Sequence, residues 1–174
     1  GIEEIIKMAV CFNKDFFEWL EKNDLKDDEN IKVAIQKSVE TKAWVVSQDE
    51  KEKGLRAALN YGHTFGHVIE NETNYNTYLH GEAVGIGICM ANDTSVKIGI
   101  MTQEESNRVK LLLQKYDIPT TYTIHDVEDF YEHFFLDKKS LDNKIKFIFA
   151  QGLGDCKITD EVSKEDIISV LKAF

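Results

Sequence analysis

Apolar residues recur at intervals of three and four positions along most of this chain, which is the period of one face of an α-helix. The spacing begins almost at once, with Ile5 and Ile6, and it continues through the central part of the sequence. It predicts long helices over residues 1–22, 31–46, 52–70 and 81–98. The last of these is apolar nearly all round and contains three glycines, so we expect it to be buried against other backbone.

The remainder of the chain combines helix signals with one short hairpin. Thr102 and Glu105 form a capping-box pattern that opens a helix, which ends near Tyr116 before the only proline. A short helix is predicted over 127–136, and a weaker capping box at residue 163 starts a terminal helix. Residues 145–150 and 156–159 are typical of two strands around a Gly-Leu-Gly turn. The sequence therefore predicts a mainly α fold, a multi-helix domain with a short β-hairpin near its C-terminus.

Composition excludes several classes of function. The 174 residues suffice for one domain, and the formal net charge of -10 argues against a nucleic-acid or anionic-membrane partner. No apolar run approaches the length of a membrane span, which is about 18 residues. The three cysteines are far apart and odd in number, which favours a reduced, cytoplasmic setting over a disulfide framework. No GxGxxG motif is present, so the usual dinucleotide fingerprint is absent from the sequence.

Three of the five histidines fall within 18 positions, at His63, His67 and His80. His63 and His67 are four residues apart on a predicted helix, so their side chains point to one face. Two histidines one turn apart, with a third from the next element, form a plausible zinc geometry. The same HxxxH pair also occurs on ordinary polar helix faces, and spacing alone leaves these two interpretations equally open.

The residues around the histidines favour a binding site. Gly62 and Gly66 lie inside the predicted helix, where each glycine costs roughly 1 kcal/mol relative to alanine, so a ligand or another backbone is expected to approach closely. Glu52, Arg56 and Asn60 precede the histidines at intervals of four, which places acid, cation and amide along one face. The alternative is a solvent-exposed face with ordinary charge pairs.

These motifs resemble the signature of the 3-dehydroquinate synthases. The resemblance is carried by GHTFGH at 62–67 and by LHGEAV at 79–84, and it extends to residues 1–7, 42–46, 50–59 and 137–139. It implies that residues 1–174 form the family's C-terminal metal- and substrate-binding domain. Because a helical pattern begins immediately and no initial Met is present, we expect the chain to be cut from a longer protein. The N-terminal NAD-binding domain is then absent from this chain.

The resemblance also implies a role for individual residues. It assigns the metal to Glu4, His63 and His80, whereas spacing alone would have chosen the three histidines. It assigns a role in proton transfer to His67 and to Glu52. Residues expected to hold the substrate are Lys7, Lys42, Arg56, Asn60 and Lys138, with Lys139 as the alternative to the last.

The implied activity is that of a lyase in the shikimate pathway of aromatic amino-acid and chorismate biosynthesis. 3-Deoxy-D-arabino-heptulosonate 7-phosphate, a sugar-acid phosphate, is converted to 3-dehydroquinate and phosphate with NAD and a divalent metal, zinc or cobalt. The full-length enzyme is expected to be a cytoplasmic homodimer. This chain by itself is expected to be inactive, because hydride transfer requires the NAD cofactor and the NAD-binding domain is expected to be absent from this chain.

Two alternatives stand beside this interpretation. One is a sister sugar-phosphate cyclase such as 2-deoxy-scyllo-inosose synthase, which uses the same metal and NAD on a substrate without a carboxylate. The other is a helical domain that keeps its metal for a structural or regulatory purpose and performs no catalysis.

Overall fold

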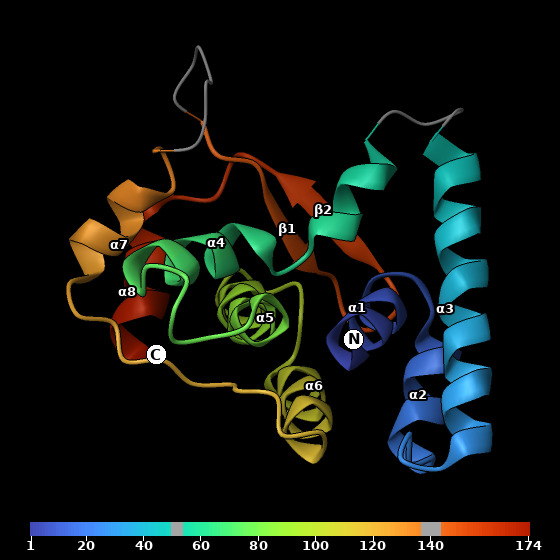
Figure 1. Cartoon of the computed structure of the whole chain (residues 1–174). Helices are drawn as coiled ribbons and strands as arrows, with labels where there is room; N and C mark the ends of the chain where they lie inside the picture. The colour runs from blue at the N-terminus through green and yellow to red at the C-terminus, as the bar shows by residue number, and fades with distance from the viewer. Residues whose placement is uncertain (50–53, 137–143) are drawn as a thin grey trace.

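The helix α5 (His80–Lys97) forms the centre of the molecule. In the computed structural model, which describes residues 1–49, 54–136 and 144–174, α5 contacts α4, α6, α8, α1 and the strand β1. Figure 1 views α5 nearly end-on, with the other elements arranged around it. Every residue from 83 to 95 except Asp93 is buried. The prediction of a buried helix over 81–98 is therefore confirmed to within one residue at each end.

The N-terminal part contains three helices where two long ones were predicted. They are α1 (Ile2–Phe12), α2 (Lys14–Lys22) and α3 (Asp28–Asp49). The single helix predicted over residues 1–22 is wrong, because Asn13 takes an extended conformation and its side chain accepts a hydrogen bond from the backbone N–H of Phe16. This is the usual cap of a new helix. The helix predicted over 31–46 is confirmed, and α3 continues beyond it at both ends.

The helix predicted over 52–70 is divided in two. A 3-10 helix, η1 (Leu55–Asn60), is followed by α4 (His63–Glu72). Gly62 separates them with a φ of 84°, a left-handed conformation that a glycine adopts without steric cost. Arg56 and Asn60 therefore do not continue the face of the helix that carries the histidines, and the predicted single polar wall is wrong.

The C-terminal half follows the local signals in the sequence. It contains α6 (Gln103–Lys115), α7 (Val127–His133), β1 (Phe147–Ala150), β2 (Cys156–Thr159) and α8 (Lys164–Ala173). Thr102 and Glu105 form the predicted capping box of α6, and the Ser163 hydroxyl caps α8. The two strands pair antiparallel, which confirms the hairpin. The helix predicted over 127–136 ends early, at residue 133.

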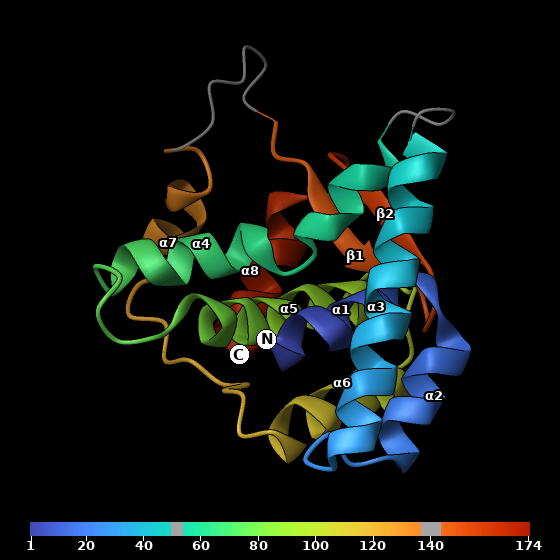
Figure 2. The same cartoon turned by 45° about the vertical axis from the view of Figure 1, so that its right-hand side comes forward.

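Two apolar clusters meet at α5. Val84 and Ile88 face the cluster formed with α1, α2, α6 and the hairpin, whereas Ile86 and Met90 face the cluster formed with α4, α7, α8 and β1. In Figure 2, α4 and α1 both lie alongside α5. The elements that carry the candidate site residues are thus packed on one helix. No helix in the described ranges is long and apolar enough to cross a membrane.

Candidate metal and substrate site

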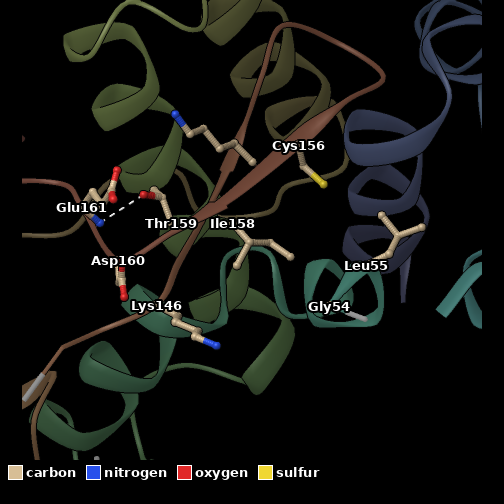
Figure 3. Close-up of a pocket in the computed structure, with 9 residues that line it drawn as sticks. Gly54, Leu55, Lys146, Cys156, Ile158, Thr159, Asp160 and Glu161 are labelled. Atoms are coloured by element: carbon tan, nitrogen blue, oxygen red, sulfur yellow. Dashed lines mark hydrogen bonds between the residues drawn. The ribbon is translucent and has the colours of Figure 1, made fainter. Parts of the chain in front are cut away.

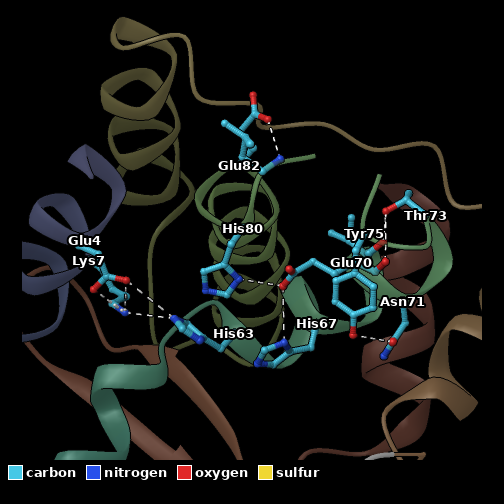
Figure 4. A network of polar contacts seen from close by, with 12 residues as sticks. Glu4, Lys7, His63, His67, Glu70, Asn71, Thr73, Tyr75, His80 and Glu82 are labelled. Carbon is cyan, nitrogen blue, oxygen red and sulfur yellow. Dashed lines mark hydrogen bonds and ion pairs between the residues drawn. The ribbon is translucent and has the colours of Figure 1, made fainter. Parts of the chain in front are cut away.

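The three histidines of the sequence motif come together in space. His63 and His67 lie on α4, and His80 is the first residue of α5. Their ring centroids are 5.7 Å apart for His63 and His67, 5.2 Å for His63 and His80, and 6.0 Å for His67 and His80. The predicted shared face of His63 and His67 is therefore confirmed, and Figure 4 shows all three rings grouped between α4 and α5.

Close packing of α4 on α5 produces this grouping. A Cβ atom at Gly66 would lie 3.1 Å from the carbonyl oxygen of Ala83, so the two helices approach with little side chain between them. At the start of α5 the backbone N–H of Leu79 donates to the Glu82 carboxylate at 2.9 Å. This cap fixes the position at which α5 begins and so the place of His80. The glycines that appeared costly in the sequence are required by this approach.

Helix α1 brings a carboxylate and an ammonium to His63. The Nζ atom of Lys7 lies 3.0 Å from Glu4 Oε1 and 3.3 Å from His63 Nε2, and it also donates to the backbone carbonyl of Leu59. Glu4 Oε1 is 3.9 Å from His63 Nε2. Lys7 is almost fully buried, with 3% of its surface exposed. Nε2 of His63 therefore faces both the Lys7 ammonium and the Glu4 carboxylate.

The charge of Glu4 is set by the same neighbours. Its contact with the His63 ring and the nearby Lys7 ammonium lower the pKa of Glu4 to about 2, although burial acts in the opposite direction. The carboxylate is therefore ionised at neutral pH. An ionised carboxylate is the form that binds a metal ion.

The donor set fits a divalent metal, although the side chains do not surround one point as they stand. Within the described part of the chain, no three His, Cys, Asp or Glu side chains are already arranged to hold a metal ion. Two of the three expected ligands, Glu4 and His63, share a cation in this structure, namely the Lys7 ammonium. Two imidazoles and one carboxylate are a ligand set used by catalytic zinc sites, which keep a position open for substrate.

Sequence reasoning missed Glu70. Its Oε1 atom lies 2.9 Å from His80 Nδ1 and 3.5 Å from His67 Nδ1, so one carboxylate oxygen faces two of the three histidines. The Glu70 side chain is only 9% exposed. A signal was present in the sequence, because Glu70 follows His67 by three positions and falls on the same helix face. Its contact with His80 depends on the packing of α4 against α5.

A cavity of about 310 Å³ adjoins two of the clustered histidines, His63 and His67. Of the predicted substrate residues, Asn60 lines it together with His63 and His67. Lys42 on α3 and Arg56 on η1 are exposed and are not among its lining residues. Glu52 and Lys138 lie outside the described residues. The structure thus brings Glu4, Lys7 and Asn60 to the histidines, and it leaves Lys42 and Arg56 outside the lining of this cavity.

A second hollow, of about 620 Å³, lies between the start of η1 and the strand β2 (Figure 3). Leu55, Lys146, Cys156 and Glu161 are among its lining residues. It shares no lining residue with the cavity beside the histidines. Its size alone does not make it the better candidate, since two of the clustered histidines, His63 and His67, line the other cavity.

Comparison with known proteins identifies the family. The model of the 3-dehydroquinate synthase C-terminal domain matches residues 1–140. The chain belongs to this family. A 3-dehydroquinate synthase from a Nitratiruptor species is 58% identical over 174 residues, and one from a Sulfurovum species is 60% identical over the same length. Both matches include the whole of this chain and 50% of the relative, so the chain spans about half the length of the curated relatives it matches.

Solved structures of two cyclases share the fold of this domain. A 2-epi-5-epi-valiolone synthase from Streptomyces hygroscopicus with NAD+ and Zn2+ bound superposes with a TM-score of 0.82 at 20% identity, over 99% of this chain and 49% of that one. A 2-deoxy-scyllo-inosose synthase complexed with carbaglucose-6-phosphate, NAD+ and Co2+ gives 0.78 at 24% identity, over 99% and 50%. At these identities the likeness establishes the fold, and the mainly α prediction is confirmed.

Proposed function

We propose that this chain is the metal- and substrate-binding half of a 3-dehydroquinate synthase. The full-length enzyme would convert 3-deoxy-D-arabino-heptulosonate 7-phosphate to 3-dehydroquinate and phosphate, a carbon–oxygen lyase reaction of the shikimate pathway. The observation that carries the proposal is the identity of 58–60% along the whole chain to relatives of that name. Identity to the two cyclases of solved structure is only 20–24%, which makes a sister cyclase the weaker candidate.

In this proposal Glu4, His63 and His80 hold a zinc or cobalt ion. The NAD+ and Zn2+ or Co2+ bound by the two related cyclases support a cofactor pair of this kind. A metal bound here would act as a Lewis acid that polarises substrate oxygens. The ionised Glu4 carboxylate is already suited to a cation, and a metal held here would replace the Lys7 ammonium beside Glu4 and His63.

Lys7 would then be available to the substrate. Its position between Glu4 and His63 keeps a buried cation beside two of the proposed metal ligands, which would suit an anionic or hydroxyl group of the substrate. Asn60 provides an amide at the adjoining cavity. Lys42, Arg56 and Lys138 complete the proposed substrate set, and His67 and Glu52 transfer protons. Anchors of this kind hold the substrate in its reactive conformer through several steps.

NAD, which accepts and returns a hydride, would be bound mainly by the part of the full-length relatives that this chain does not cover. We therefore propose that this chain alone is inactive and that titration with NAD gives no saturable heat or fluorescence change. Clear saturable binding by the isolated chain would contradict the proposed division between the domains. The homodimeric state and the cytoplasmic location of the full-length enzyme stay predictions.

Product identity tests the proposed function. The full-length enzyme containing this chain is incubated with NAD, a divalent metal and either the heptulosonate phosphate or glucose 6-phosphate. We expect phosphate release and 3-dehydroquinate, detected by its mass, from the first substrate only. Turnover of glucose 6-phosphate would identify a 2-deoxy-scyllo-inosose synthase instead. A tightly bound metal without turnover of either substrate would favour a non-catalytic domain.

A further inference from the structure

Glu70 is a nearly buried carboxylate whose neighbours are imidazoles. Among the described residues, the ion-pair partners found for it are His67 and His80, and no lysine or arginine is among them. Burying a carboxylate costs free energy unless hydrogen bonds and opposite charge compensate. Hydrogen bonds from two imidazoles supply only part of that compensation. A divalent cation on the far side of one of these rings would supply the rest.

The geometry at His80 defines which ring nitrogen faces outward. Its Nδ1 atom lies 2.9 Å from Glu70 Oε1, and a carboxylate only accepts, so Nδ1 carries the proton. When the ring is neutral, its lone pair is therefore on Nε2, the atom left for a metal. Imidazoles that bind metals usually donate their second nitrogen to such a carboxylate, which fixes the tautomer and the orientation of the ring.

We propose that Glu70 is a positioning residue that holds His80 in the tautomer presenting Nε2 to the metal. The same carboxylate oxygen faces Nδ1 of His67 at 3.5 Å, so Glu70 also sets the orientation of the proposed proton-transfer histidine relative to the metal ligand. One side chain on α4 thereby ties together two histidines from different helices (Figure 4). The inference rests on the proposed function, because it presupposes a metal at Glu4, His63 and His80.

The chain contains a matched control for Glu70. Glu72 lies on the same helix with a similarly small exposure, 12% against 9%, but its partners are outside the histidine cluster. Its carboxylate accepts from the Tyr122 hydroxyl at 2.8 Å and lies 3.8 Å from His133 Nδ1. Removing the charge of Glu72 tests the general effect of losing a buried carboxylate from α4.

The first experiment measures zinc affinity by competition with a chelator for this chain and its Glu70→Ala, Glu70→Gln and Glu72→Gln variants. We expect Glu70→Ala to weaken zinc binding about 10–100-fold, the usual effect of losing a carboxylate behind a ligating histidine. Glu70→Gln retains an acceptor and should lose less, and Glu72→Gln should bind like the unsubstituted chain. Equal affinity in Glu70→Ala and the unsubstituted chain, both folded by circular dichroism, would overturn the proposal.

The second experiment does not depend on how any variant folds. Long-range nitrogen–proton NMR spectra of the metal-free chain report the tautomer of His80 directly. We expect the proton on Nδ1, and a spectrum with the proton on Nε2 would contradict the role of Glu70.

The zinc measurements separate this inference from the proposed function. If the unsubstituted chain binds no zinc at all, the metal site of the proposed function is wrong. If it binds zinc while Glu70→Ala binds equally well, only the role of Glu70 fails.

Discussion

Gly87 on α5 lies directly against the backbone of Gly62 at the start of α4: a Cβ atom at position 87 would stand 2.1 Å from the Gly62 carbonyl oxygen. No side chain can occupy that space, because backbone atoms of α4 cannot move away cheaply. The two helices that meet here carry all three clustered histidines. The contact therefore sets the distance between His63 and His80, and it links a packing requirement to the candidate metal site.

Substitution of Gly87 by alanine is expected to destabilise the fold by about 3 kcal/mol, the upper part of the range for overpacking, although alanine is the better helix former. For a chain of this length that corresponds to a fall in Tm of roughly 6–12 °C. Gly99→Ala is the control, since Gly99 has a φ of 82° and no atom near its Cβ position. It should cost only about 1 kcal/mol, from backbone strain alone. Equal losses in the two variants would contradict the proposed contact.

Local signals in the sequence predicted much of this fold. The capping box at Thr102 and Glu105 and the cap at Ser163 act within one turn, so α6 and α8 begin where the pattern places them. The break at Asn13 was missed because apolar residues keep helical spacing on both sides of it. The break at Gly62 was missed because its left-handed backbone is tied to packing against α5.

The contacts of the candidate site also divide into those that a local sequence pattern predicts and those that depend on packing. The one-turn spacing of His63 and His67 is a property of a helix and could be predicted. The contact of Lys7 with His63 joins residues 56 positions apart, and that of Glu70 with His80 joins two helices. The periodicity of the sequence cannot predict such contacts, because they depend on how α1, α4 and α5 pack together. The family resemblance supplied Glu4 and Lys7, but it did not supply Glu70.

Tyr61 and Asn92 form a buried polar pair that can be tested by a double-mutant cycle. The Tyr61 hydroxyl donates to Asn92 Oδ1, and both residues are almost fully buried. Tyr61→Phe leaves the Asn92 amide without this partner and is expected to cost about 1–3 kcal/mol. Combining it with Asn92→Leu should cost clearly less than the sum of the two single changes, measured by urea unfolding. Strict additivity would contradict an energetic coupling between the two side chains.

The three cysteines are expected to differ in reactivity. A hydrogen bond from Cys11 lowers the pKa of the half-buried Cys156 thiol, despite an opposing effect of burial, whereas burial raises the pKa of Cys89 to about 12. The thiolate is the reactive form, so at neutral pH Cys156 should be alkylated by iodoacetamide first and Cys89 only after unfolding. Peptide mass spectrometry at increasing times measures the order.

The pH dependence and a variant provide the control for Cys156. Because its pKa is lowered, its alkylation rate should reach half of its maximum at a lower pH than that of an unperturbed thiol, about 8.5. Cys11→Ala removes the donor, and the midpoint should then move upward. An unchanged midpoint in Cys11→Ala would mean that Cys11 does not stabilise the Cys156 thiolate.

His63 and His67 share one face of α4, so their separate roles need a measurement that distinguishes them. His63 Nε2 faces Glu4 and Lys7, while His67 Nδ1 faces Glu70. If His67 transfers protons and does not bind the metal, His67→Ala in the full-length enzyme should keep near-normal metal content while turnover falls roughly 10²–10⁴-fold. His63→Ala should lose metal and turnover together. Metal stoichiometry measured alongside turnover decides the question, and a loss of metal in His67→Ala as large as in His63→Ala would restore the three-histidine site that spacing alone suggested.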